Sequence, residues 1–333
     1  MKVAINGFGR IGRVVLRAAL DMGVLGEKFE LVAINDPGGA QNAAQLLKYD
    51  SVHGKLEEEL KVGKDWVSVD GVRIPIVSER DPLKLPWKEM GVETVLECTG
   101  VFRKRDEAAM HISAGAKKVL ISAPAKDKVD ATIIMGVNEQ EYDRKKHSII
   151  SMASCTTNCL APVVKLINDN FKVRDGFMTT IHAYTNDQRV LDTYHKDVRR
   201  ARAAGVNIIP TSTGAAKAIG EVIPEMAGKM DGIALRVPVA CGSITDMVFN
   251  VEKKVGVGEV NEVFKKAAKG KMKGILEYSE EPLVSTDVVG NAHSSIIDGE
   301  LTKVIGNSVK VLAWYDNEWG YSCRMVDMVT KIL

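Results

Sequence analysis

The sequence predicts an α/β protein of two domains, and three observations lead to this prediction. A glycine-rich turn, residues 7–12, directly follows an apolar N-terminal stretch. Short apolar strands then alternate with helical stretches up to about residue 150. From residue 151 onward that alternation changes character. We therefore predict a Rossmann-type domain at 1–150, followed at 151–316 by an α+β domain with a mixed or antiparallel sheet.

The N-terminal turn reads Gly7-Phe8-Gly9-Arg10-Ile11-Gly12, between a strand at 2–6 and an amphipathic helix. In that setting Gly7 allows the tight turn, Gly9 lets a pyrophosphate approach the backbone, and Gly12 lets helix pack on strand. The phosphates would bind at the helix N-terminus. A glycine turn in an unrelated α/β domain remains the alternative at this point.

A second apolar strand, at 31–35, ends at Asp36. A carboxylate at this strand end accepts hydrogen bonds from the ribose hydroxyls of adenosine and repels a 2′-phosphate, which favours NAD over NADP. Thr99 and Ser122 follow two further strands, and the carboxyl ends of such strands line a cofactor crevice. Both residues are candidate cofactor contacts, although each could equally be a turn residue.

The remaining elements follow from apolar periodicity. We expect strands at 66–69, 74–77, 94–98, 119–122, 131–137, 147–153, 176–181, 232–237, 243–251 and 309–315, and helices at 106–114, 160–171 and 257–269, with a closing amphipathic helix.

Cys155 lies at the junction between a predicted buried strand and a helix. Free backbone N–H groups and the positive end of the helix dipole meet there, and both lower a thiol's pKa. The hydroxyls of Ser154, Thr156 and Thr157 suit an anion or a developing oxyanion. A Ser/Thr helix cap with two buried cysteines is the alternative interpretation of this stretch.

His182 ends the predicted strand at 176–181, and a second Ser/Thr/Gly turn, containing Thr213 and Gly214, leads into another helix. Together with a dinucleotide fold these features indicate aldehyde oxidation. Cys155 would add to an aldehyde as a thiohemiacetal, and His182 would accept the hydroxyl proton while hydride leaves for nicotinamide, giving a thioester. The turn at 210–217 would bind phosphate.

The composition excludes several classes of protein. Hydrophobic residues make up 45% of the chain, but no apolar run approaches the ~20 residues of a membrane span, so none is expected. The net charge of +2 is near balance and gives no case for a polyanion partner. The polar segment 187–205 alternates acids with bases, which indicates a salt-bridged loop at a subunit contact rather than a nucleic-acid surface. Five cysteines without a CxxC pair suggest neither a metal cluster nor disulfides, hence a cytoplasmic protein with reduced thiols.

Several motifs together resemble the phosphorylating glyceraldehyde-3-phosphate dehydrogenase family along nearly the whole chain. They are INGFGRIGR at 5–13, SCTTN at 154–158, HAYTNDQ at 182–188, RRARAA at 199–204, TGAAK at 213–217 and YDNEWGY at 315–321. The resemblance implies oxidative phosphorylation of D-glyceraldehyde 3-phosphate to 1,3-bisphosphoglycerate with NAD and inorganic phosphate. It also implies a homotetramer and a last helix, 317–333, that packs back on the dinucleotide-binding domain.

The resemblance also assigns roles to residues. Cys155 is the nucleophile and His182 its base. The cofactor contacts implied, beside Gly7, Gly9 and Gly12, are Arg10, Ile11, Asp36, Arg80, Ser122, Asn317 and Tyr321. Ser154, Thr156, Thr213 and Gly214 match the site for attacking phosphate, and Thr185, Arg236 and the nearby Asp187 match the site for the substrate's phosphate. For Arg236 the resemblance is the sole basis.

Two departures bear on the cofactor. Thr193-Tyr194 stands where the family often has Leu-Pro, and Pro37-Gly38-Gly39 after Asp36 is atypical. We therefore expect NAD preference with secondary use of NADP. Cys159, one helical turn from Cys155, either packs or acts as a resolving thiol.

Two alternatives remain open. Erythrose-4-phosphate dehydrogenase shares the thiol and the dinucleotide site, and Tyr194-His195 and His293-Ser294-Ser295 give it modest support. A non-catalytic dinucleotide- or RNA-binding protein, or a thiol redox sensor, comes from a different class.

Overall fold

The computed structural model describes residues 1–333. It divides into two compact units. Unit 1 comprises residues 1–133, 140–153 and 322–333, and unit 2 comprises residues 134–139 and 154–321. No helix is both long enough and apolar enough to cross a membrane.

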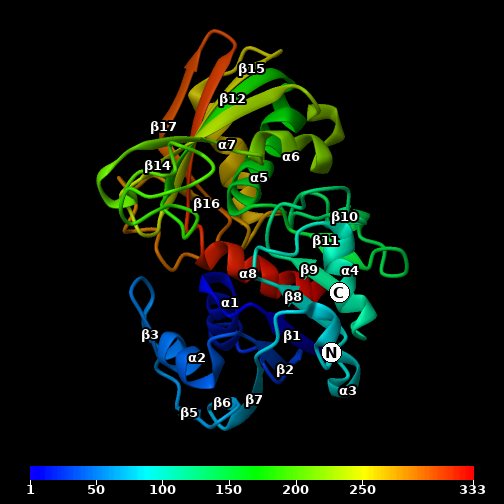
Figure 1. Ribbon diagram of the computed structural model, residues 1–333. Coiled ribbons are helices and arrows are strands. Elements are labelled where there is room, and N and C mark those ends of the chain that lie inside the picture. Colours follow the sequence, from blue (N-terminus) through cyan, green and yellow to red (C-terminus); the bar gives the residue numbers. More distant parts are fainter. The chain divides into compact units, whose positions relative to one another are not determined.

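Unit 1 contains a nine-stranded sheet in the order β10-β11-β9-β8-β1-β2-β7-β6-β5 (Figure 1). Its strands are β1 (Lys2–Asn6), β2 (Glu30–Asn35), β5 (Leu60–Val62), β6 (Trp66–Val69), β7 (Val72–Val77), β8 (Thr94–Glu97), β9 (Lys118–Ile121), β10 (Ala131–Thr132) and β11 (Ile149–Ser151). β1 pairs in parallel with both β2 and β8, whereas β5, β6 and β7 pair antiparallel. This is the predicted Rossmann-type arrangement, in which β1 lies where the strand order reverses.

The helices of unit 1 are α1 (Arg10–Asp21), α2 (Gly39–Lys48), α3 (Trp87–Met90) and α4 (Arg105–Ser113), and a two-stranded ribbon pairs β3 (Tyr49–Asp50) with β4 (Gly54–Lys55). Short 3₁₀ helices are η1 (Pro82–Lys84) and η2 (Glu139–Glu141). α8 (Trp319–Asp327) continues into one π-helical stretch, Met328–Ile332.

Unit 2 contains a seven-stranded mixed sheet in the order β13-β14-β12-β15-β18-β17-β16. The strands are β12 (Val173–Ala183), β13 (Ile209–Ser212), β14 (Met230–Val237), β15 (Ser243–Val251), β16 (Leu276–Ser279), β17 (Ser295–Ile305) and β18 (Ser308–Tyr315). Figure 1 shows α5 (Cys155–Phe171), α6 (Ala215–Val222) and α7 (Val257–Lys269) gathered on one side of the long strands. The 3₁₀ helices here are η3 (Ala204–Val206) and η4 (Pro224–Met226).

Two predicted strands are wrong in length. The strand expected at 131–137 ends at Thr132, because Gly136 has φ +81° and the Asn138 side chain binds the Ile134 N–H at 2.8 Å, forming a turn. The strand expected at 147–153 is only Ile149–Ser151, since the Asp130 carboxylate takes the N–H of Ser148 at 2.9 Å. The helix of the cysteine stretch begins at Cys155 and ends at Phe171, which confirms the predicted cysteine at a helix start and the helical run at 160–171. No prediction was made for the ribbon, α2, α3, β5, β13, β16 and β17.

Candidate active site

Strand alternation directs the central polar residues of unit 2 to one face of its sheet. In β12 the residues Met178, Thr180 and His182 are all buried, and α5 packs on that side. His182 pairs in register with Arg236 of β14, so a guanidinium lies beside the imidazole. Neighbouring strands therefore build the site from residues far apart in the chain.

Cys155 is the first residue of α5, and Ser154 is its N-cap. The Ser154 Oγ accepts a hydrogen bond from the Thr157 N–H at 3.0 Å, which satisfies one of the free donors of the first turn. The Cys155 Sγ lies 3.4 Å from His182 Nε2. The structure thus brings the two predicted reacting groups within hydrogen-bonding distance, although the chain separates them by 27 residues.

The other ring nitrogen of His182 has two neighbours. Nδ1 lies 2.7 Å from the Ala183 carbonyl oxygen and 2.5 Å from Arg236 Nη1, and that same Nη1 donates to the Ala183 oxygen at 2.9 Å. The carbonyl oxygen can only accept and the guanidinium can only donate, so a proton on Nδ1 satisfies the carbonyl but faces the Arg236 donor. In that tautomer Nε2 is the acceptor toward the thiol. Burial, followed by the positive charge of Arg236, lowers the pKa of His182 to about 3. His182 is therefore a neutral base.

The thiol does not behave as the helix start alone predicts. Burial raises the pKa of Cys155, and it outweighs the charge of Arg236 and the hydrogen bonds of Thr156, which lower it. The expectation of a lowered thiol pKa is thus wrong, because the desolvation of the thiolate outweighs the stabilisation by these partners. Reactivity then depends on transfer of the thiol proton to His182.

Tyr315 is a member of the site that sequence reasoning did not identify. Its hydroxyl lies 3.0 Å from Thr156 Oγ1 and 2.8 Å from Thr180 Oγ1, and its ring stands edge-on to the His182 ring, with centroids 6.0 Å apart. The side chain is fully buried in β18. The inward alternation of this last strand is the signal that would have indicated it.

Cys159 is buried and contacts Ser295 Oγ at 3.5 Å, and burial raises its pKa to about 12. A thiol so protected from ionisation is a poor nucleophile, which favours the packing role over the resolving one.

The predicted anion-binding residues lie in loops of the same unit. Gly214 is the N-cap of α6, whose first turn has no acidic residue, and Thr213 Oγ1 accepts the Ala215 N–H at 3.2 Å. Thr185 is exposed, and its N–H binds the Gln188 side chain at 3.2 Å. None of these three residues contacts Cys155 or His182 directly; Arg236 alone among the substrate-phosphate candidates touches the catalytic pair.

Asp187 forms an ion pair with Arg200, and its Oδ1 lies 3.5 Å from His195 Nε2. Burial raises the pKa of Asp187, but the hydrogen bond and charge of Arg200 outweigh that effect and hold the pKa below its usual range. Arg200 also reaches the Ser212 carbonyl at 3.4 Å, next to Thr213. A further pair joins Arg202 to Asp192 at 2.9 Å, so the prediction of a salt-bridged loop is confirmed.

In unit 1 the glycine turn leaves space for a ligand. Gly7 has φ +91°, and a Cβ on Gly12 would lie 2.2 Å from the Gly7 oxygen, so helix and turn are in direct contact. A Cβ on Gly9 would meet nothing within 4 Å. No side chain caps α1, and its first turn has no acidic residue. The uncompensated helix terminus beside open space fits a pyrophosphate.

The other predicted cofactor residues of unit 1 lie after strands of the sheet or at the start of α1. Asp36 follows β2, and its carboxylate accepts the N–H of Phe8 at 3.2 Å and of Gly38 at 2.8 Å. Each oxygen retains a lone pair for a ribose hydroxyl. Arg10 pairs with the buried Asp50. Ile11 lies in the first turn of α1, Arg80 is exposed after β7, and Ser122 directly follows β9.

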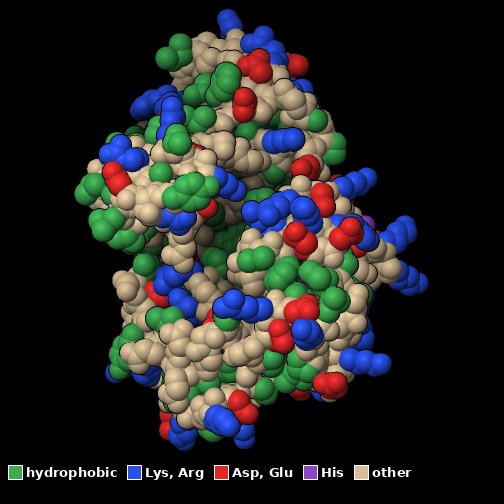
Figure 2. Space-filling view, viewed as in Figure 1, with side chains coloured by type: hydrophobic (Ala, Val, Ile, Leu, Met, Phe, Trp, Pro, Cys, Tyr) green, Lys and Arg blue, Asp and Glu red, His purple; other side chains and the backbone are tan.

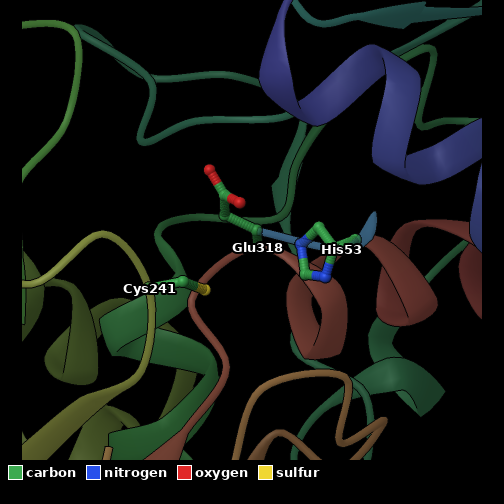
Figure 3. A group of neighbouring side chains, drawn as sticks. All are labelled: His53, Cys241 and Glu318. Atoms are coloured by element: carbon green, nitrogen blue, oxygen red, sulfur yellow. The ribbon is translucent and has the colours of Figure 1, made fainter. Parts of the chain in front are cut away.

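The two remaining cofactor candidates lie in unit 2. Asn317 is 5% exposed and Tyr321, in α8, is 4% exposed. Asp316, which directly precedes Asn317 in the chain, accepts a hydrogen bond from the Cys241 thiol, with 3.0 Å between Oδ1 and Sγ. Figure 3 shows Cys241 and Glu318 near this turn; the third side chain labelled there, His53, belongs to unit 1.

Comparison with known proteins identifies the family. Residues 1–105 match the model of the glyceraldehyde 3-phosphate dehydrogenase NAD binding domain, and residues 154–317 match that of the C-terminal domain. The chain is 57% identical to glyceraldehyde-3-phosphate dehydrogenase of Priestia megaterium and 55% identical to glyceraldehyde-3-phosphate dehydrogenase 2 of Streptomyces avermitilis, in each case over 100% of this chain and 98% of the relative. Glyceraldehyde-3-phosphate dehydrogenase 2 of Bacillus subtilis is 54% identical over 100% of this chain and 96% of its own. The chain belongs to the glyceraldehyde-3-phosphate dehydrogenase family.

Proposed function

We propose that this protein oxidises D-glyceraldehyde 3-phosphate with NAD and inorganic phosphate to 1,3-bisphosphoglycerate. The observation that supports this most is the contact of 3.4 Å between Cys155 Sγ, at a helix start, and His182 Nε2. Nucleophile and base in this relation are what covalent aldehyde oxidation requires.

His182 takes the thiol proton, the Cys155 sulfur adds to the aldehyde carbon, and His182 returns that proton to the aldehyde oxygen, which gives a thiohemiacetal. The proton of the thiohemiacetal hydroxyl then passes to His182 as the carbon is oxidised to the thioester. When bound, NAD supplies the acceptor for the hydride that this oxidation releases. Inorganic phosphate attacks the thioester carbon, the carbon–sulfur bond breaks, and the thiolate returns with an acyl phosphate as product.

Two anion sites serve the substrates in this proposal. Arg236 and Thr185 hold the phosphate of glyceraldehyde 3-phosphate, with Asp187 close by and paired with Arg200, while Ser154, Thr156, Thr213 and Gly214 hold the attacking phosphate. The contact of Arg236 with His182 supports a substrate phosphate near the base, and the uncapped acid-free start of α6 supports an anion at Gly214.

For the cofactor, Gly7, Gly9, Arg10, Ile11 and Gly12 hold the pyrophosphate. Asp36 accepts the ribose hydroxyls, Arg80 and Ser122 add contacts, and Asn317 and Tyr321 attend the nicotinamide. The open space at Gly9 and the lone pairs left on Asp36 support these assignments. Because Asp36 is negative, NAD is preferred and NADP use is secondary.

We further propose a cytoplasmic homotetramer in which unit 1 is the dinucleotide-binding domain, onto which the last helix packs, and unit 2 is the catalytic domain. Five free cysteines support a reducing compartment. Large apolar side chains of the loop 187–205 are exposed, among them Val190 at 86%, Tyr194 at 84% and Val198 at 80%. Figure 2 shows one face of the molecule on which such side chains gather among charged ones. Exposed apolar groups of this number favour burial against another copy.

The test is NADH formation from glyceraldehyde 3-phosphate and NAD, with and without inorganic phosphate, beside a Cys155→Ser variant. Phosphate-dependent turnover that the variant lacks supports the proposal. Turnover that ignores phosphate would mean hydrolysis of the thioester and would overturn the phosphorylating step. Mass photometry at working concentration tests the tetramer separately.

A further inference from the structure

The side-chain amide of Asn317 is held at its oxygen. Oδ1 accepts hydrogen bonds from the Ser243 hydroxyl at 2.8 Å and from the Gly242 N–H at 3.2 Å, and Cys241 Sγ lies 3.9 Å away. The residue is 5% exposed, and Ser243 is 1% exposed. In this buried environment the Ser243 hydroxyl and the Gly242 N–H determine that the amide oxygen of Asn317, and not its nitrogen, faces them.

The direction of the Ser243 hydrogen bond follows from its other partner. The Ala183 N–H reaches Ser243 Oγ at 3.1 Å, and a backbone amide can only donate. The hydroxyl proton then points to a second partner, and Asn317 Oδ1 lies 2.8 Å away. The Gly242 N–H can only donate, so the reversed amide would place its NH₂ group against that donor and leave the Ser243 hydroxyl without its acceptor. The oxygen of Asn317 must face Ser243.

The backbone beside the amide is equally fixed. Asp316 Oδ1 accepts the N–H groups of Glu318 and Trp319, each at 2.8 Å, and its Oδ2 accepts that of Gly290 at 2.7 Å. These bonds cap the start of α8, so Asn317 cannot rotate away with its backbone. Its Nδ2, with two N–H donors, has no partner within the protein. The Nδ2 atom itself remains accessible, so its two donors are open to an acceptor oxygen of a ligand.

We propose that Ser243 is a positioning residue that turns the Asn317 amide so that Nδ2 donates to the carboxamide oxygen of nicotinamide. This inference rests on the proposed function, in which Asn317 attends that end of NAD. The same Ser243 hydroxyl accepts from the residue after His182, so one side chain fixes both the amide and the end of the catalytic strand. Ser243 itself touches neither substrate nor cofactor.

The experiment compares NAD with ADP-ribose, which lacks only the nicotinamide, by isothermal titration calorimetry. In Ser243→Ala the Kd for NAD should rise about tenfold, the effect of losing one buried hydrogen bond of about 1.4 kcal/mol, while the Kd for ADP-ribose stays within twofold. Ser243→Thr keeps the hydroxyl and should restore the NAD Kd to within about threefold of the parent. Ser294→Ala is the matched control, because its buried hydroxyl has no partner, and both Kd values should be unchanged.

Equal weakening of both ligands in Ser243→Ala would mean a purely structural role and would overturn the proposal, as would unchanged binding of both. If the alanine variant fails to fold, Ser243→Cys gives the same comparison with a weaker donor. Failure of the proposed function is distinct: the parent protein would then form no NADH in the phosphate assay, whatever the ratio of the two Kd values.

Discussion

We expect the hydroxyl of Tyr315 to contribute both to the stability of the fold and to phosphate binding. The substitution Tyr315→Phe removes this hydroxyl and keeps the ring. The oxygen bridges Thr156 Oγ1 at 3.0 Å and Thr180 Oγ1 at 2.8 Å, and the side chain is 1% exposed. Each buried hydrogen bond contributes about 0.5–1.5 kcal/mol net, so losing two should lower the free energy of unfolding by about 1–3 kcal/mol. In the variant the Thr180 hydroxyl still donates to the Ile244 carbonyl oxygen at 3.5 Å. We therefore expect a loss of unfolding free energy in the lower half of that range.

The same substitution should affect one kinetic constant in particular. Thr156 belongs to the proposed site of attacking phosphate, and without the Tyr315 hydroxyl its own hydroxyl is free to turn. The KM for inorganic phosphate should rise several-fold, while the KM for glyceraldehyde 3-phosphate changes less than twofold.

Calorimetric unfolding measures the first effect and steady-state kinetics the second. Tyr278→Phe is the matched control: its hydroxyl binds Glu280 at 3.1 Å near the surface, so its loss should cost less than about 0.5 kcal/mol. The reasoning fails if Tyr315→Phe matches this control in stability and leaves the KM for phosphate unchanged.

Three further predictions concern charge. The substitution Arg236→Gln removes the positive charge beside His182 Nδ1, so the pKa of His182 and the pKa of Cys155 should both rise. NMR titration measures the pKa of His182, and the pH profile of alkylation measures that of Cys155. Two unchanged pKa values would contradict the contact. Burial raises the pKa of Asp50, but hydrogen bonds from the backbone N–H groups of His53 and Val52 and the charge of Arg10 outweigh it and lower the pKa to about 2. The ionised Asp50 therefore stabilises the fold above about pH 4, and this stabilisation is lost as pH falls toward 2. Unfolding free energy should thus fall by about 2 kcal/mol more over this range in the parent than in Asp50→Asn, and parallel curves would refute the assignment. Asp36→Ala should raise the NADP-to-NAD ratio of kcat/KM about tenfold or more; equal efficiencies already in the parent would contradict the role of this carboxylate.

Local signals in the sequence account for much of the fold. The glycine turn between strand and helix required no tertiary information, because Gly7 needs a positive φ and Gly12 needs contact with the turn, and both are properties of a short segment. The Ser154 cap likewise places Cys155 at a helix start from neighbouring residues alone. Alternation in 176–181 was sufficient to predict a strand leading to His182.

The strand lengths near the end of unit 1 show where local signals fail. Apolar residues at 131–137 and 147–153 favour extended structure, but side chains of Asp130 and Asn138 take backbone N–H groups and end the pairing. Such side-chain competition depends on three-dimensional proximity as well as on composition.

The sequence by itself determined the two-domain α/β plan, the dinucleotide turn and the pair Cys155 and His182, since each follows from short-range periodicity and capping. Tertiary structure alone decided that Arg236 stands beside His182, that Tyr315 joins Thr156, and that burial raises the pKa of Cys155. Register between strands and desolvation arise from contacts between residues distant in the chain, and no local pattern encodes them.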